Sequence, residues 1–254
     1  MKTRRIGWRI LTVVIILLLV TMLVIPAIAA VDDAYSVALL HMNGSDASTT
    51  FTDESGKTWT AHGNAQLDTA QKKFGTASGL FDGTGDYIST PDSADFYFGT
   101  GDFTIDCWVR INSLPTAQAQ TLYTQATDAN NRIMFSYDYS NPNYRLKIEV
   151  VNSSTYEIQM IKNWSPSVNT WYHLAVSRNG NNTRLFVNGT QLGTTDTSSY
   201  TVANYTGTPI LGARYSVDTL FMNGWIDEMR ISKGISRYDG DFTPSSSEYA
   251  PPTD

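Results

Sequence analysis

The fold is decided by one stretch near the end of the chain, Phe221-Met222-Asn223-Gly224-Trp225-Ile226-Asp227-Glu228-Met229-Arg230-Ile231-Ser232. The stretch begins with the turn signal Asn223-Gly224 and continues with an alternation of apolar and charged residues, which is typical of a β-strand. If the alternation is strict, one face of this strand carries Trp225, Asp227, Met229 and Ile231, and the other carries Ile226, Glu228 and Arg230.

Asp227 is the unusual member of its face, because the neighbouring side chains there are apolar. An unpaired buried charge costs a large amount of free energy. We therefore expect the Asp227 carboxylate to be partnered by an arginine, by backbone N–H groups or by a metal ion.

The rest of the chain shows the same kind of patterning. Short alternating or β-branched runs are separated by Gly, Asn, Asp, Ser and Pro clusters, and no segment has a convincing helical period. The clearest strands are residues 103–111 and 171–178, and Asn188-Gly189 is a strong hairpin signal. Residues 43–56 are acidic and turn-forming, so they predict a loop. The sequence therefore predicts an all-β, two-sheet antiparallel sandwich.

The first 30 residues read as a targeting segment. Basic residues precede an apolar run from Ile10 to Ile25, and Ala27-Ile28-Ala29-Ala30 fits a signal-peptidase site. The alternative is an uncleaved membrane anchor, because the apolar run approaches the length that spans a bilayer. Both readings place the remainder outside the cytoplasm, secreted or at the cell surface. We expect one sandwich domain over residues 31–245 and a flexible polar tail over 246–254.

Charge and cysteine content exclude some classes of function. The net charge of −6 becomes −10 when the four cations of the leader are removed. Without a basic patch to neutralise phosphates, a nucleic-acid partner is not expected. Cys107 is the only cysteine, so an intramolecular disulfide is impossible, and we interpret it as a small core residue.

Four segments, in this order and spacing, resemble the laminin-G-like, concanavalin A-type jelly-roll domains. They are residues 73–88 (KFGTASGLFDGTGDYI), residues 101–109 (GDFTIDCWV), residues 169–176 (NTWYHLAV) and the stretch quoted first. The resemblance covers roughly residues 35–245 and implies a two-sheet jelly-roll sandwich. This scaffold serves lectins, carbohydrate-binding modules, adhesive ectodomains, virion proteins and some glycoside hydrolases, so the fold alone does not identify a function.

A catalytic site is not expected. Retaining glycosidases on this scaffold place two carboxylates on one strand face about 5 Å apart. Strict alternation would place Asp227 and Glu228 on opposite faces. His41, His62 and His173 have no spacing that indicates a zinc site or a catalytic triad. We therefore predict that the protein is not an enzyme.

The resemblance also implies one structural calcium ion near the chain ends, and calcium prefers oxygen ligands. The candidate ligands implied in this way are Asn43, Asp53, Asp82 and Asp227. The alternative is that Asp82 makes an ordinary turn with Gly83, while Asp227 pairs with Arg214 or Arg230 or caps backbone N–H groups.

Aromatic and amide side chains in the predicted loops are candidates for sugar binding, because aromatic faces stack on the C–H faces of sugars. The candidates are Tyr137, Tyr139, Tyr144, Trp164, Tyr205 and Tyr215. We therefore expect an exported, non-catalytic binding or adhesion module that recognises a glycan or a surface protein. The alternative is a structural surface-layer or virion-type domain without a small ligand. Membrane contact is expected only through an uncleaved leader.

Overall fold

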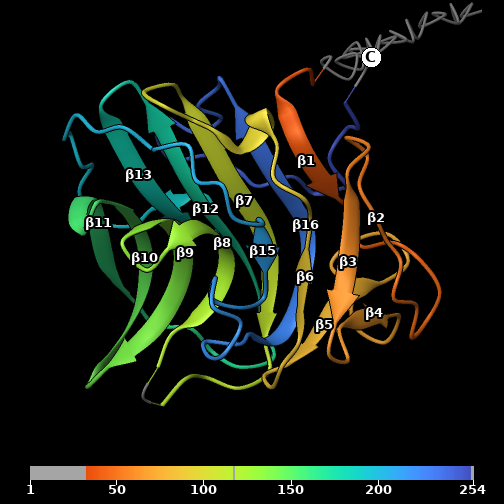
Figure 1. Cartoon of the computed structure of the whole chain (residues 1–254). Helices are drawn as coiled ribbons and strands as arrows, with labels where there is room; N and C mark the ends of the chain where they lie inside the picture. The colour runs from red at the N-terminus through yellow and green to blue at the C-terminus, as the bar shows by residue number, and fades with distance from the viewer. Residues whose placement is uncertain (1–32, 117, 253–254) are drawn as a thin grey trace, which may run out of the picture. The chain divides into compact units, whose positions relative to one another are not determined.

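Two antiparallel β-sheets pack face to face and enclose the apolar core (Figure 1). The computed structural model describes residues 33–116 and 118–252, which form 16 strands and one short 3-10 helix, η1 (Ala94–Phe96). The predicted leader, residues 1–30, lies outside the described residues. None of the helical structure in the described part of the chain has the length and apolar character needed to cross a membrane.

The first sheet is built around the last strand, β16, which contacts three other strands. β16 pairs with β7 along one edge, and with β5 and β1 along the other. Its members, in sheet order, are β14 (Thr190–Gln191), β13 (Asn182–Val187), β12 (Trp171–Asn179), β7 (Phe103–Ile111), β16 (Asn223–Lys233), β5 (Ser78–Asp82) and β4 (Gln66–Asp68), with β1 (Ser36–Leu40) beside β16.

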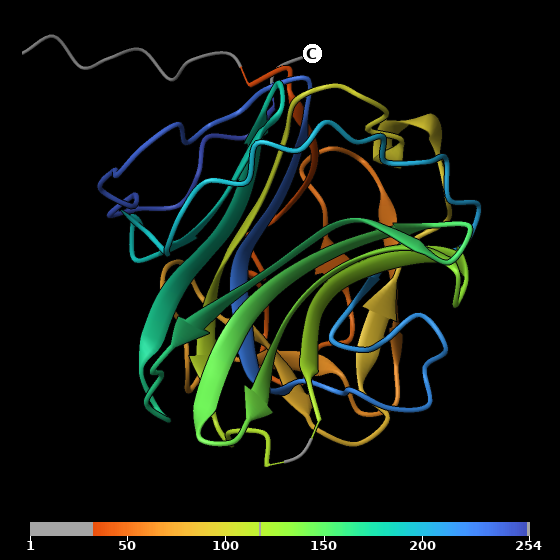
Figure 2. The same cartoon turned by 90° about the vertical axis from the view of Figure 1, so that its left-hand side faces the viewer.

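The second sheet contains the longest hairpins of the chain, and Figure 2 shows that its strands β8 to β10 are strongly curved. All its strand pairs are antiparallel. In sheet order its members are β11 (Thr155–Trp164), β10 (Asn143–Asn152), β9 (Asn131–Ser140), β8 (Gln120–Asp128), β15 (Ile210–Leu211), β6 (Tyr87–Ser89), β3 (Thr58–His62) and β2 (Phe51–Thr52).

Alternation determines which side chains enter the core between the sheets. On β7 the predicted inner face is confirmed, because every second residue from Phe103 to Ile111 is fully buried in the core. The Asn188-Gly189 hairpin is also confirmed, with both residues at positive φ between β13 and β14. The predicted all-β antiparallel sandwich is therefore correct.

Short elements in the first third of the chain were not predicted. β2 falls inside residues 43–56, which the sequence predicts to be a loop. β3, β4 and η1 lie where the sequence predicts no regular element. Each has only two to five residues. Runs of that length are too short for a period of two to stand out from a loop.

A β-bulge interrupts the alternation of β16. Asp227 pairs with Trp108 and Arg230 pairs with Asp106, so Glu228 and Met229 together lie opposite Cys107. The φ of Glu228 is 49°, a backbone conformation typical of bulges and uncommon in side-chain-bearing residues. Because one residue is added, Met229 enters the core with Ile226, and Asp227 lies outside it.

The bulge corrects two expectations from strict alternation. Asp227 does not share a face with Met229 and Ile231, which are core residues. The argument that adjacent carboxylates at positions 227 and 228 must point to opposite faces also fails, because a bulge residue follows no alternation. Asn223-Gly224 is likewise part of β16 and not a turn. Gly224 is required there, since a Cβ would lie 2.2 Å from the backbone oxygen of Arg110.

The C-terminal segment packs against the outside of the first sheet. The side chain of Tyr249 is buried, its N–H donates to Glu228 Oε2, and its hydroxyl donates to Asp106 Oδ2. The prediction of a flexible polar tail from residue 246 is therefore wrong at Tyr249. The surrounding residues are polar, but burial of the Tyr249 ring stabilises the packed position of this segment.

Candidate functional site

The bulge in β16 helps to form a polar cluster where both ends of the domain meet. We call this the chain-end cluster and define it by His41, Asn43, Asp227, Glu228 and Glu248. His41 and Asn43 follow β1, Asp227 and Glu228 belong to β16, and Glu248 lies in the C-terminal segment. Within it, the hydrogen bond between Asn43 and Glu248 joins residues that are 205 positions apart in the sequence.

Asp227 binds the backbone of the segment before β5. Its Oδ2 accepts hydrogen bonds from the N–H groups of Lys73 at 2.6 Å and Phe74 at 3.2 Å, while its buried Oδ1 has no hydrogen-bond partner. Burial raises the pKa of Asp227 to about 7, although these N–H groups act to lower it. The expectation that Asp227 caps backbone N–H groups is confirmed, and Arg230 pairs with Asp106 instead.

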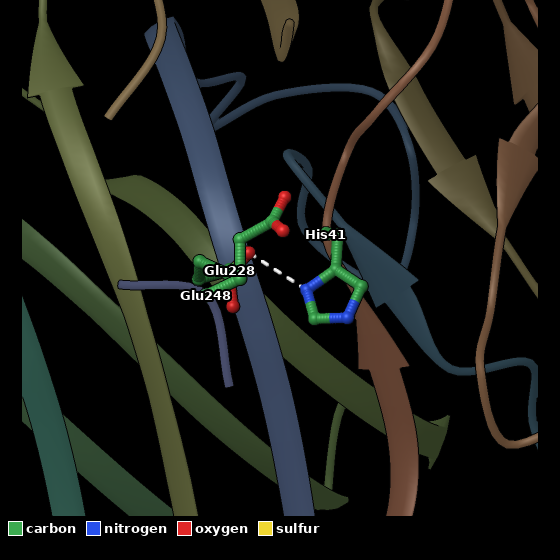
Figure 3. A group of neighbouring side chains, drawn as sticks. All are labelled: His41, Glu228 and Glu248. Atoms are coloured by element: carbon green, nitrogen blue, oxygen red, sulfur yellow. Dashed lines mark hydrogen bonds and ion pairs between the residues drawn. The ribbon is translucent and has the colours of Figure 1, made fainter. Parts of the chain in front are cut away.

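Glu228 lies between His41 and the C-terminal segment (Figure 3). Its Oε1 is 2.7 Å from His41 Nδ1, and one ligand atom from each of His41, Glu228 and Glu248 falls within 4.8 Å of the others. Burial lowers the pKa of His41, but hydrogen bonding to Glu228 and the nearby carboxylates outweigh it and raise the pKa overall. The imidazole and the Glu228 carboxylate therefore form a hydrogen-bonded pair, which is an ion pair when His41 is protonated.

The structure does not bring the four predicted calcium ligands together. Asp53 accepts hydrogen bonds from the Leu39 and Ser55 N–H groups and from Trp59 Nε1, so both carboxylate oxygens already have partners. Asp82 is exposed and accepts from the N–H of Thr84 in an ordinary turn. Among the described residues, these carboxylates form no group that could share an ion.

Asn43 and Asp227 do meet the same segment, residues 73–76. Asn43 Oδ1 accepts from the N–H of Thr76 at 2.6 Å, and its amide nitrogen donates to Glu248 Oε1. Sequence reasoning missed His41, Glu228 and Glu248, because their proximity depends on the bulge and on the path of the C-terminal segment. No local motif signals either feature.

Asp53 is buried and fully hydrogen-bonded, whereas Asp82 is exposed, and this difference gives a testable prediction. Asp53→Asn should lower the free energy of unfolding by about 2 kcal/mol, because an amide nitrogen would face buried N–H donors. Asp82→Asn is the matched control and should change stability little, since an exposed asparagine also makes such a turn. Urea unfolding of both variants measures the difference. Equal losses that appear only in the presence of calcium would instead support the calcium set predicted from the sequence.

A second polar region covers the outer face of the second sheet, meaning the face that points away from the core. On β9 and β10 apolar residues enter the core, and the residues between them face outward. The outward residues of these two strands include Met134, Ser136, Asp138, Arg145, Lys147 and Glu149. Polar groups therefore alternate with core residues along the two strands.

The charged side chains of this outer face form one connected network. Arg145 binds Asp138 through two hydrogen bonds of 2.8 and 2.7 Å. The Lys147 ammonium lies 3.4 Å from Asp138 and 3.2 Å from Glu149, and Gln159 also donates to Glu149. Asp138 and Glu149 are 7% and 4% exposed, so their side chains and partners are held in fixed positions on the outer face.

The same network argues against a glycosidase site on this face. Burial raises the pKa of Asp138, but the hydrogen bond from Arg145 and the charge of Lys147 lower it overall. The acid residue of a glycosidase needs a raised pKa, because it must hold a proton at the working pH. In this structure Asp138 accepts both hydrogen bonds from Arg145.

The predicted sugar-binding aromatic residues divide into two groups. Tyr137, Trp164 and Tyr205 are buried in the core, where Tyr137 donates to Gln120 and Tyr205 donates to the Val151 carbonyl, so these predictions are wrong. For Tyr137 and Trp164, the positions inside strands were a signal for burial, whereas Tyr205 lies in a loop and only tertiary packing buries it. Tyr139, Tyr144 and Tyr215 are partly exposed, and Tyr139 and Tyr144 pack together with ring centroids 5.0 Å apart.

Tyr215 lines a hollow of about 440 Å³ on the outer face of the second sheet. The hollow also contains His62 on β3 and Tyr87 on β6, which the sequence analysis did not select as ligand-binding residues. Short strands and their partners determine this position. His62 belongs to no recognisable motif, and Tyr87 lies in segment 73–88, where nothing marks a ligand-binding ring.

Comparison with known proteins agrees with this architecture. A family profile described as the concanavalin A-like lectin/glucanases superfamily matches residues 82–235, which is more than half of the chain. The chain belongs to this superfamily. Within the concanavalin A-like superfamily, the match includes β6 to β15 and the bulge of β16, and it confirms the resemblance stated from the sequence. No curated protein sequence matches the chain.

Several solved structures share the concanavalin A-like fold. Domain 4 of AbnA, a GH43 extracellular arabinanase from Geobacillus stearothermophilus, in complex with arabinotriose, has 21% identity and a TM-score of 0.60; the match covers 80% of this chain and 95% of that domain. The botulinum neurotoxin serotype D binding domain has 18% identity and a TM-score of 0.59, over 80% of this chain and 50% of that one.

The binding domain of Paraclostridial Mosquitocidal Protein 1 has 16% identity and a TM-score of 0.57, again over 80% of this chain and 50% of that one. The chain thus spans about half the length of the two toxin binding domains. At these identities the similarity establishes the fold.

Proposed function

We propose that this protein is an exported, non-catalytic binding module that recognises a glycan through the outer face of the second sheet. The observation that carries the proposal is the network of Asp138, Arg145, Lys147 and Glu149, which holds oriented donors and acceptors on the same outer face as a hollow containing aromatic rings. Such a combination suits sugars, whose hydroxyls need hydrogen bonds and whose C–H faces need apolar contact.

Three further observations support the proposal. The solved structures with this fold include a domain in complex with arabinotriose and the binding domains of toxins. The lowered pKa of Asp138 is a property of an acceptor and not of a catalytic acid. Export is supported by the leader-like sequence of residues 1–30. A protein surface is the alternative partner for the same face.

A glycan array with the purified full-length protein tests the proposal. We expect binding to a subset of glycans, and Arg145→Ala should weaken it by about tenfold or more, because Asp138 loses its main partner and its orientation. Arg184→Ala, on β13 of the first sheet, is the matched control and should bind as the unchanged protein does. Absence of binding to every glycan, or equal binding by both variants, would contradict the proposal.

We propose separately that a structural calcium ion binds at the chain-end cluster, with Asn43 and Asp227 as ligands. The support is the unpartnered, buried Asp227 Oδ1 and the shared contact of both residues with segment 73–76. Calcium should raise the thermal unfolding temperature of the unchanged protein and not that of Asp227→Asn, and a chelator should reverse the increase. If calcium leaves the unfolding temperature unchanged, the ion is not part of the structure.

A further inference from the structure

We propose that the hollow lined by His62, Tyr87 and Tyr215 is the subsite that selects the ligand, and that it takes an uncharged sugar ring. This inference rests on the proposed glycan-binding function and adds the class of sugar and its position. The hollow lies where β3, β6 and β15 meet the connection between β15 and β16, and its volume of about 440 Å³ falls in the range of small-molecule sites.

One wall of the hollow is an ordered aromatic pair. His62 and Tyr87 are register partners on β3 and β6, and their rings stack in parallel with centroids 4.2 Å apart. His62 Nε2 is 2.9 Å from Ser89 Oγ, which also lines the hollow and fixes the orientation of the imidazole ring. Because both rings are already held, a sugar stacking there would cost little side-chain entropy.

The opposite wall comes from the connections on either side of β15. Tyr215 and Val217 contribute from the segment before β16, and Val217 has a φ of 48°, which is strained for a β-branched residue. Gly207 lets the preceding connection approach β8 closely, since a Cβ there would lie 1.7 Å from the backbone oxygen of Ala126. The shape of the hollow is therefore set by backbone that tolerates few substitutions.

The chemistry of the lining determines the class of ligand. Among residues 33–116 and 118–252, no Asp, Glu, Lys or Arg lines the hollow, and its side-chain polar groups are the His62 imidazole, the Tyr hydroxyls and the hydroxyls of Ser89, Thr127 and Thr208. Arg214 lies beside the Tyr215 ring, but its guanidinium is paired with Asp218 at 2.8 Å. A carboxylate or sulfate placed there would lose water without gaining a counter-charge, whereas a neutral ring needs only stacking and hydroxyl contacts.

Binding of small oligosaccharides to the full-length protein tests the inference. The neutral probes are maltotriose, cellotriose and arabinotriose, and the charged probes are sialyllactose and trigalacturonic acid. In titration calorimetry we expect at least one neutral probe to bind and the charged probes to bind more weakly. Tyr215→Ala should weaken binding by about tenfold, the loss expected when a ring that carries binding is removed.

A second variant separates loss of stacking from misfolding. Thr208→Trp adds a bulky ring at an exposed position of the lining, so it should block the hollow without disturbing the core and also abolish binding. Tyr35→Ala is the matched control, because Tyr35 is an exposed tyrosine that precedes β1 and lies outside the second sheet, and this variant should bind as the unchanged protein does.

The outcomes distinguish this inference from the function on which it rests. If charged probes bind best, or if neutral probes bind both variants as tightly as the unchanged protein, glycan binding stands and the subsite inference is wrong. If neither these probes nor the array show any glycan bound, both proposals are wrong.

Discussion

Replacing Asp106 with alanine should lower the free energy of unfolding by about 3–5 kcal/mol, the loss typical of breaking a buried ion pair. Asp106 lies on β7 at the outer side of the first sheet and is completely buried. It accepts two hydrogen bonds from Arg230, at 3.1 and 2.8 Å, and one each from the hydroxyls of Tyr238 and Tyr249. Burial raises the pKa of Asp106, but the Arg230 charge and the hydrogen bonds from His173 and Arg230 hold it well below its usual range.

The alanine variant loses more than one contact. Arg230 would remain 7% exposed with no counter-charge, and an uncompensated buried charge is costly. The hydroxyls of Tyr238 and Tyr249 would lose their acceptor, so the C-terminal segment would also lose its attachment to β7. The penalty therefore combines an orphaned cation with the loosening of a segment that Tyr249 holds in place.

Denaturant unfolding at neutral pH measures the loss. Asp218→Ala is the matched control, because Asp218 also pairs with an arginine at 2.8 Å but is exposed to solvent. An exposed ion pair contributes little, so this variant should unfold almost as the unchanged protein does. If Asp106→Ala lost no more stability than Asp218→Ala, the buried network would not have the role described here.

The second large effect is a dependence of stability on pH that originates at Asp227. Its folded-state pKa is raised to about 7, above an ordinary value of 3.8, chiefly by burial. A group with a raised folded-state pKa contributes its full stability below the unfolded-state pKa and loses it as pH rises through the folded-state value. Between about pH 4 and pH 7 the protein should therefore lose up to about 4 kcal/mol through this one carboxyl.

Comparison with Asp227→Asn isolates this contribution. The asparagine oxygen can still accept from Lys73 and Phe74, and the side chain stays neutral at every pH. The difference in unfolding free energy between the two proteins should change by about 1.4 kcal/mol per pH unit across this window. His41 also has a raised pKa, but it is present in both proteins and cancels in the comparison.

Calcium changes the expected result in a defined way. An ion at Asp227 would favour the charged carboxylate, so saturating calcium should flatten the pH dependence. If the difference in unfolding free energy between the two proteins did not change with pH in the absence of calcium, the raised pKa of Asp227 would be contradicted. If this free-energy difference still changed by about 1.4 kcal/mol per pH unit with calcium present, the calcium proposal would be contradicted and the raised pKa would stand.

The sandwich could be predicted because its pattern is local. Phe103 to Ile111 alternates between core and outer positions without interruption. In such a strand the polarity of each residue indicates whether that residue faces the core. The candidate sites could be predicted only in part. The loop position of Tyr215 predicts a candidate ligand contact. The proximity of His62 and Tyr87 could not be predicted, because it depends on the pairing of β3 with β6. Tyr137 and Trp164 were selected wrongly, because burial was not judged from their strands.

Residue patterns alone predict the superfamily, the antiparallel architecture and the need of Asp227 for a partner. The identity of that partner depends on the tertiary structure. The bulge at Glu228 moves Asp227 out of the core face, and the segment at Lys73 supplies its partners from 154 residues away. Alternation is a property of neighbouring residues, but a bulge and a long-range contact depend on how distant strands pair. A single strand pattern carries no information about either.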